Sequence, residues 1–436
     1  MPATDTTVVH ARRSPHAILA RAGLAITGLG ITGLALTSLA VTSFALVGCD
    51  SGTPPTTAAT QTNPPAASGA PSASGATASK DVAIPSPTVF PGSTVKFPPL
   101  GTFVQGSRSS AFAPGKVYVF EFFSTTCGHC AEAFEIIDGL IADYGQKGFE
   151  FISVTSEDEK VVRDWLAKPE NAEVVKHAVA LDPRSRAQNA LQSGTFQVQT
   201  PRLFAVRDGI VLWFGHPELA ADPFAQIAAG TWKPSDHVAE AVLNSKLAWA
   251  RNEMTSLETK CAQDGNWTPL LAFLDSMTRQ LASKASTFEI QKFGTLIGPA
   301  GMPAEGYALG RELAKKYASD LQTLRSLART TMNSPDVKER DFTFALEMVT
   351  AADTVGQQKD ARAAELMALY HFSMGDREKA LEHQERAIQL EQDGKNKARF
   401  LTLLEKYKKD EPKPVPYAPR APKPPAASAS AGTTGK

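Results

Sequence analysis

The chain has 436 residues, which is enough for two or three domains. Lys plus Arg and Asp plus Glu both number 45, and this zero net charge excludes nucleic-acid binding driven by a basic surface and a broadly basic membrane-binding face. Four cysteines are too few for a disulfide framework, so those at positions 49, 127, 130 and 261 are each interpreted separately.

The N-terminal segment has the composition of an export signal. Three arginines precede an uncharged, largely apolar run over 22–48. The run ends in Leu-Val-Gly-Cys at 46–49, which resembles the bacterial lipobox, so Cys49 is the expected lipidation site. An uncleaved signal anchor that spans the bilayer is the alternative, because the run is long. Both interpretations predict that the rest of the chain lies outside the cytoplasmic membrane, on the periplasmic side of the cell envelope.

Two further segments are too poor in large apolar side chains to fold. The first, rich in Ser, Thr, Ala, Pro and Gly, follows the lipobox, and the second is the Pro- and Ala-rich C-terminus. We therefore expect a signal peptide over 1–49, a disordered linker over 50–91 and a disordered tail over 411–436.

The next pattern is a strand, a turn and a helix in direct succession. The run VYVFEFF at 117–123 predicts a central strand buried on both faces. The sequence Cys-Gly-His-Cys follows at 127–130, and apolar residues then recur at helical spacing over 134–144. Cys127 is thus expected at a helix N-terminus, where free N–H groups and the helix dipole favour a thiolate. His129 adds a second potential cation.

The alternation of strands and helices continues beyond this point. Strands are predicted over 149–154 and 175–181, and helices over 157–167 and 184–192. A strand hairpin over 203–214, preceded by Thr200-Pro201, and a closing helix over 222–229 complete the pattern.

These residues together resemble the thioredoxin superfamily, in particular the exported TlpA-like redoxins, over 92–233. The resemblance implies an α/β thioredoxin-like fold, a central mixed sheet with flanking helices. It also implies that Cys127 attacks a substrate disulfide, that Cys130 resolves the mixed disulfide, and that Pro201 is a cis-proline beside the pair. Glu121 occupies the position of a buried acid that relays protons for the resolving cysteine.

The sequence also departs from that family. Thr126 stands where a tryptophan often precedes the first cysteine, and Gly-His between the cysteines is the dipeptide of protein disulfide isomerases, which implies a more easily reduced disulfide. The direction of the reaction, as a reductase, oxidase or isomerase, therefore stays open.

Alternatives exist for each candidate site residue. A C-x-x-C pair also serves as half a zinc site or survives as an inert relic, but no second Cys/His pair at ligand spacing follows, and no His follows Cys130 to form a haem motif. We therefore expect no metal and no organic cofactor. Glu121 has a purely structural alternative, His129 an incidental surface one, and Pro201 an ordinary trans bond. Cys261 is expected to be a buried, inert thiol.

The region 234–410 contains helical patterns and no strand pattern, so an all-α domain is predicted. Helical runs are expected over 237–257, 267–282, 304–318, 321–332 and 341–352. Residues 361–392 resemble a tetratricopeptide unit, and alanines at 345 and 352 lie 35 residues before those at 380 and 387. Such TPR-like helix pairs offer a concave face for a protein partner, although a domain that only packs is the alternative.

The combined expectation is a membrane-anchored thiol-disulfide oxidoreductase. Its expected partners are exported protein thiols or disulfides, a membrane-bound or soluble thiol that donates electrons, the membrane through the lipid anchor, and no nucleic acid. A thiol peroxidase-type redoxin is a second enzymatic hypothesis, because redoxins share the fold. A non-catalytic TPR scaffold is the third.

Overall fold

The computed structural model describes residues 81–107 and 109–410. The expected signal peptide, the lipidation site Cys49, most of the linker and the tail lie outside the described residues. Within the described ranges, no helix combines the length and the apolar character that crossing a bilayer requires.

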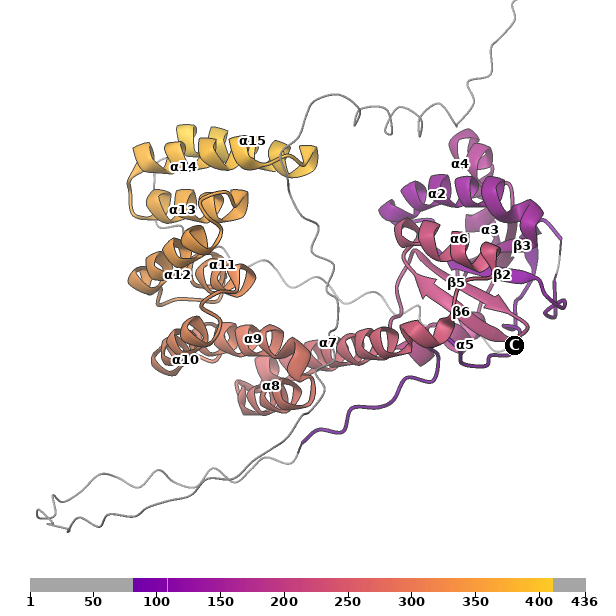
Figure 1. Ribbon diagram of the computed structural model, residues 1–436, viewed down its shortest axis with the longest axis horizontal. Helices are drawn as coiled ribbons and strands as arrows, with labels where there is room; N and C mark the ends of the chain where they lie inside the picture. The colour runs from indigo at the N-terminus through magenta and orange to yellow at the C-terminus, as the bar shows by residue number, and fades with distance from the viewer. Residues whose placement is uncertain (1–80, 108, 411–436) are drawn as a thin grey trace, which may run out of the picture. The chain divides into compact units, whose positions relative to one another are not determined.

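The first part of the described chain is an α/β unit built on a mixed sheet (Figure 1). Its six strands follow the order β1-β4-β3-β2-β5-β6. β2 pairs in parallel with β3, and β3 with β4, whereas β5 and β6 are antiparallel to their neighbours. The strands are β1 (Phe103–Gln105), β2 (Val117–Phe122), β3 (Phe149–Thr155), β4 (Ala178–Leu181), β5 (Arg202–Arg207) and β6 (Ile210–Gly215). This mixed sheet with flanking helices confirms the predicted thioredoxin-like fold.

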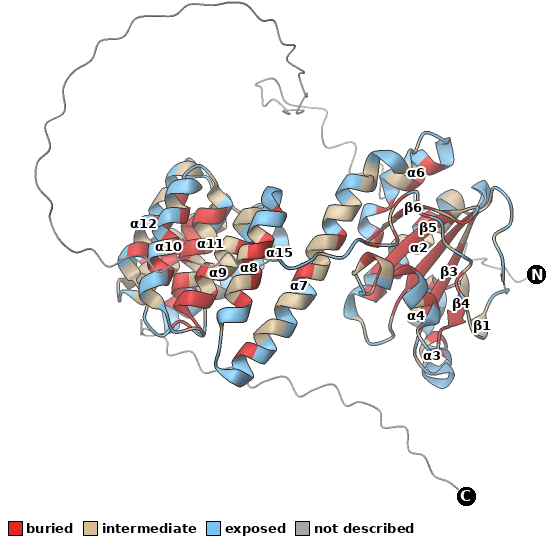
Figure 2. Ribbon diagram, turned by 90° about the horizontal axis from the view of Figure 1, so that it is seen from below, coloured by how far each residue is buried: buried red, intermediate tan, exposed pale blue. Residues whose placement is uncertain are grey.

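Apolar clusters cover both faces of the sheet. On one face, alternate residues of β2 pack against α2 (Gly128–Tyr144), α3 (Glu159–Leu166) and α6 (Ala221–Ala229). The intervening residues of β2 pack on the other face against α5 (Arg186–Leu191). Every residue of β2 is therefore buried, which explains the continuous apolar run in the sequence. Much of the sheet is coloured as buried in Figure 2.

Two expectations for this unit need correction. The strand predicted from residue 175 begins only at Ala178, because the short helix α4 (Pro169–Val174), with proline in its first turn, occupies the chain before it. The predicted linker also extends too far. Val89 is 4% exposed in the apolar cluster beside α5, and its backbone N–H donates to the carbonyl of Gly194 at 3.2 Å. A side chain at Gly194 would collide with Val89, so glycine permits this close approach.

The region after the sheet is entirely helical in the described residues, as predicted. Figure 1 shows the helices from α8 onward following one another in a stack. The nine helices are α7 (Val238–Asp264), α8 (Thr268–Gln280), α9 (Ala285–Ile297), α10 (Pro303–Lys316), α11 (Leu321–Asn333), α12 (Phe342–Val355), α13 (Ala361–Ser373), α14 (Arg377–Leu390) and α15 (Gly394–Lys409). Helices α9 and α15 were not predicted from the sequence.

Ion pairs in the helical region recur at the spacing of one helix pair. Arg325 contacts Asp360 at 2.8 Å, and Arg386 contacts Asp353, so each bridge joins helices that lie two apart in the chain. Glu365 on α13 accepts from Arg329 on α11 and Arg399 on α15. The four bridges span 33 to 36 residues. The alanines at 345, 352, 380 and 387 are fully buried, as the repeat pattern requires. This periodicity agrees with stacked helix pairs.

Candidate active site

The two cysteines of the C-x-x-C pair lie at the N-terminus of α2. Cys127 is the N-cap residue, with an extended backbone, and Cys130 lies in the first turn. Both are free thiols. Cys127 is half-buried, whereas Cys130 is 1% exposed. The sulfur of Cys127 can therefore meet a substrate, whereas solvent does not reach that of Cys130. This difference agrees with the sequence-based expectation that Cys127 attacks and Cys130 resolves.

The environment of Cys130 favours its protonated form. Burial, together with a hydrogen bond with Cys127, raises the pKa of this thiol to about 12, although a hydrogen bond with the backbone of Ser124 opposes the shift. Because only the thiolate is nucleophilic, Cys130 needs a base within the protein before it can attack.

Glu121 is the buried acid predicted from the sequence. It is 2% exposed on β2, on the sheet face that α2 covers, and its charge acts on Cys130. Burial raises its pKa from an ordinary value of 4.5 to about 8, while a hydrogen bond from Ser153 lowers it. A carboxyl group with this pKa is about one-tenth ionised at neutral pH, so it can both accept and release a proton there.

Pro201 lies beside the pair. The Thr200–Pro201 peptide bond is cis, as expected, and Pro201 is buried at the start of β5. The Sγ atom of Cys127 donates to the carbonyl oxygen of Thr200 at 3.7 Å. The structure thus brings the cis-proline loop and the outer cysteine together. His129, in contrast, is exposed on α2.

Glu157 is a site residue that the sequence analysis missed. Its carboxylate accepts hydrogen bonds from the backbone N–H of Thr125 at 2.8 Å and from the hydroxyls of Ser124 and Thr125 at 2.9 Å. These bonds hold the turn before Cys127, where the family often has a tryptophan. The position of Glu157 just after β3 was the available signal, because the carboxyl ends of the parallel strands β2 and β3 meet at one sheet edge.

Two more polar residues were missed: Ser153, which contacts Glu121, and His177, which contacts Ser153. Ser153 on β3 is fully buried and donates to Oε2 of Glu121. Its Oγ atom also lies 2.6 Å from Nε2 of His177, the residue before β4. Burial lowers the pKa of His177 to about 4, so this imidazole is neutral at physiological pH.

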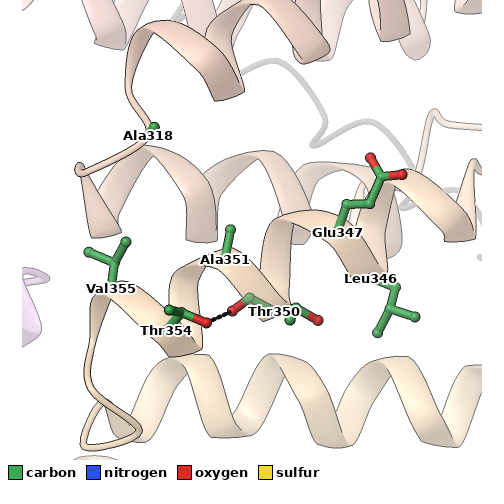
Figure 3. A pocket seen from close by; sticks show the side chains of 7 residues that line it. All are labelled: Ala318, Leu346, Glu347, Thr350, Ala351, Thr354 and Val355. Atoms are coloured by element: carbon green, nitrogen blue, oxygen red, sulfur yellow. Dashed lines mark hydrogen bonds between the residues drawn. The ribbon is translucent and has the colours of Figure 1, made fainter.

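A shallow hollow occurs on the helical region (Figure 3). It is open to solvent, has a volume of about 550 Å³ and is lined mainly by α12 residues, with Glu347 as its ionisable group. The lining residues are Ala318, Leu346, Glu347, Thr350, Ala351, Thr354 and Val355. Its lining residues include no cysteine or histidine. The described residues also contain no group of three or more His, Cys, Asp or Glu that could hold a metal ion.

Comparison with known proteins assigns the class of the α/β unit. Residues 104–218 match the family model described as Redoxin. This match, the mixed sheet and the paired cysteines define a thioredoxin-like oxidoreductase domain of the redoxin type.

Individual relatives resemble this part of the chain. Protein FixW of Rhizobium leguminosarum is 25% identical over 140 residues, covering 30% of this chain and 63% of FixW. The chain thus spans less than two thirds of that relative. A putative thiol:disulfide interchange protein DsbE from Chlorobium tepidum is 21% identical, with a TM-score of 0.25, over 32% of this chain and 98% of DsbE. A reduced 2-Cys peroxiredoxin from Plasmodium vivax is 14% identical, with a TM-score of 0.23, over 27% and 66% of the two chains.

Proposed function

We propose that the chain is a lipid-anchored thiol-disulfide oxidoreductase that exchanges disulfides with exported proteins through Cys127 and Cys130. One observation carries the proposal: the accessible sulfur of Cys127 lies against the cis-proline loop, while Cys130 is buried and lies near Glu121, a buried acid with one oxygen that has no hydrogen-bond partner among the described residues. A nucleophile and a resolving thiol need these two different environments.

In the reducing direction, the Cys127 thiolate attacks one sulfur of a client disulfide. A Cys127–client disulfide forms, and the other client sulfur leaves as a thiolate. Cys130 then passes its proton to the Glu121 carboxylate and attacks the Cys127 sulfur. The Cys127–Cys130 disulfide forms, the second client thiolate leaves, and two electrons have passed from the protein to the client. A thiol donor restores the dithiol by the reverse exchange.

Parallel assays of insulin reduction by a dithiol and of hydrogen peroxide turnover test this proposal. We expect the full chain to accelerate insulin reduction and to turn over peroxide no faster than free dithiol. Peroxide turnover without insulin reduction would overturn the proposal in favour of a thiol peroxidase. Full activity in the cell of a variant that lacks both cysteines would favour the scaffold hypothesis.

The proposed location is the periplasmic side of a bacterial membrane, supported by the lipobox-like sequence that ends in Cys49. The lipids attach through this sulfur alone, so Cys49→Ala should leave an unlipidated precursor. Labelling with a radioactive fatty acid, followed by cell fractionation, measures the effect. Lipid found on the Cys49→Ala chain would contradict the proposed anchor.

A further inference from the structure

A pocket lies beside the cis-proline loop, at the sheet edge where the paired cysteines lie. It has a volume of about 360 Å³, and both Gln199 and Arg202, which flank Thr200–Pro201 in the sequence, line it. The carbonyl oxygen of Thr200 contacts Sγ of Cys127. The Cα atoms of Thr200 and Arg202 are at most about 7 Å apart, because the two residues are two positions apart in the chain. A short peptide that reacts at Cys127 can therefore also reach this pocket.

Arg202 places a buried positive charge in the pocket. It pairs in register with Phe122, the last residue of β2, and it is 6% exposed. Its neighbour Leu203 packs under α2, so the side chain of Arg202 points to the opposite face of the sheet. There, Cζ of the guanidinium lies 5.3 Å from the ring centroid of Phe214. Burial lowers the pKa of Arg202 to about 10, so the group is still charged at neutral pH.

This guanidinium has fewer partners than a buried charge needs. Its Nη2 atom donates to Oε1 of Gln197 at 2.6 Å, and Nε is buried without a partner. Nη1 has no partner among the described residues either and, unlike Nε, is not closed off from the pocket. No carboxylate of the described chain forms an ion pair with Arg202. An unpaired buried charge is costly, so packing alone does not explain this residue.

The other lining side chains favour a peptide over a small free ion. Apolar surface comes from Phe214 and from Leu219, which is 68% exposed. Val198, next to the lining residues Gln197 and Gln199, is 57% exposed. Exposed apolar side chains beside a polar pocket are typical of a surface that binds another protein.

The charges of the pocket favour an anion that carries one negative charge. Among its lining residues, Arg202 is the one permanent cation, and His216 and His237 add no permanent charge. Glu240, in the first turn of α7, also lines the pocket, but it is exposed. A carboxylate balances the single charge of the guanidinium, whereas a phosphate would bring a second negative charge close to Glu240.

We infer that this pocket binds the carboxylate of an Asp or Glu side chain that lies within about three residues of a client's reacting cysteine. The inference rests on the proposed function and narrows its clients to proteins with an acidic residue near the disulfide. Nη1 of Arg202 donates to the carboxylate, and the apolar rim covers neighbouring side chains of the client. Arg202 does not act on the sulfurs, so it determines specificity and takes no part in the exchange itself.

Peptides with one activated cysteine test the pocket directly. Each carries its cysteine as a mixed disulfide with pyridine-2-thiol, has capped ends, and has Glu or Gln one, two or three residues from the cysteine on either side. Attack by Cys127 of the reduced full chain on the peptide sulfur releases pyridine-2-thione, whose absorbance gives the second-order rate constant. A chain without Cys127 and Cys130 gives the background from other thiols.

Three variants accompany the wild type. Arg202→Gln removes the charge from the pocket, and Glu240→Gln removes the opposing charge. Arg207→Gln, at the other end of β5 and outside the pocket, is the matched control.

At low salt, we expect wild type and Arg207→Gln to react about tenfold faster with the Glu peptide than with the Gln peptide for at least one position of the acid. Arg202→Gln should reduce this preference to less than about twofold by slowing the Glu peptide alone. Its unchanged rate with the Gln peptide would show that the variant is folded. Glu240→Gln should strengthen the preference, because it removes a repulsive charge. If Arg202→Gln does not fold, this strengthening decides the test.

The two proposals fail in different ways. If no peptide reacts faster than the background, the proposed function fails. If wild type reacts with Glu and Gln peptides alike at every position, or if Arg202→Gln keeps the preference, the carboxylate pocket is wrong while the proposed function stands. Equal slowing of both peptides in Arg202→Gln would also overturn the pocket, because it would indicate that Arg202 only holds the loop through Gln197.

Discussion

Both the α/β unit and the helical region bury a carboxylate, and the two carboxylates have different partners. Glu365 on α13 is 6% exposed and contacts two arginines, Arg329 and Arg399. Glu121 on β2 is 2% exposed, receives one neutral hydrogen bond and leaves one oxygen unpaired. A fully paired charge joins helices, whereas a poorly paired one has a raised pKa and can exchange a proton. The comparison separates a carboxylate that is paired with arginines from one whose raised pKa allows it to exchange a proton near neutral pH.

The largest expected effect is a loss of disulfide exchange, which depends on the α/β unit alone. Cys127→Ser should lower disulfide exchange by at least about a thousandfold, because the attacking sulfur is lost. Cys130→Ser should keep the attack and accumulate mixed disulfides, which non-reducing gels and mass spectrometry detect. Equal loss in both variants, with no mixed disulfide, would contradict the assigned order of the two cysteines.

The next effect concerns stability in the helical region. Glu365→Ala removes the shared partner of two arginines and should lower the free energy of unfolding by about 3 kcal/mol. Denaturant melts followed by circular dichroism measure this loss. Glu385→Ala, on an exposed position of α14, is the matched control and should change stability little. Redox activity should be retained in both variants; loss of disulfide exchange in Glu365→Ala would break the comparison.

A smaller effect is the pH dependence of stability that the raised pKa of Glu121 should cause. Folded Glu121 holds its proton to about pH 8, but the unfolded chain releases it near 4.5, so stability should fall as pH rises between these values. His177 acts oppositely from about pH 4 to 6.5, because only its unfolded form gains the proton there. The two effects largely cancel up to about pH 6.5. Between about pH 6.5 and 8 only Glu121 acts, and the free energy of unfolding should fall by about 2 kcal/mol. Denaturant melts at several pH values should show it in wild type and not in Glu121→Gln.

The smallest effect on chemistry is expected from removing the helical region. Deletion of residues 236–410 should change insulin reduction by less than about twofold, because every residue assigned to the exchange lies in the α/β unit. Capture of clients in cells by the Cys130→Ser variant should decrease if the helix pairs bind proteins. Loss of insulin reduction in a folded deletion variant would show that the two regions act as one unit.

The sequence predicted those features that depend on neighbours along the chain. The apolar run of β2, the cysteines at the start of α2, the cis bond at Pro201 and the burial of Glu121 are all confirmed. These features follow from local pattern or from the resemblance to redoxins. Their roles in exchange remain predictions.

The sequence could not reveal features that depend on lateral register. Ser153 and His177 are single polar residues, and only the alignment of β2 with β3 and the start of β4 brings them to Glu121. The helix α9 was missed for a local reason, since glycine and two threonines weaken its helical pattern. Gly294 lies close to Thr330 of α11, whose side-chain methyl would have to shift slightly to admit a Cβ at this position.

The burial of Cys261 on α7 affects how many thiols of the native protein can react with a reagent. Its side chain is 2% exposed among apolar residues such as Phe273 and Leu274, as expected for an inert thiol. Of the three described cysteines, only Cys127 presents its sulfur outside a closed core. An alkylating reagent applied to the reduced native protein should therefore label one of these three positions, and all three after denaturation. Mass spectrometry of the two samples then measures the redox state of the Cys127–Cys130 pair, and Cys261 in the same polypeptide serves as the internal reference.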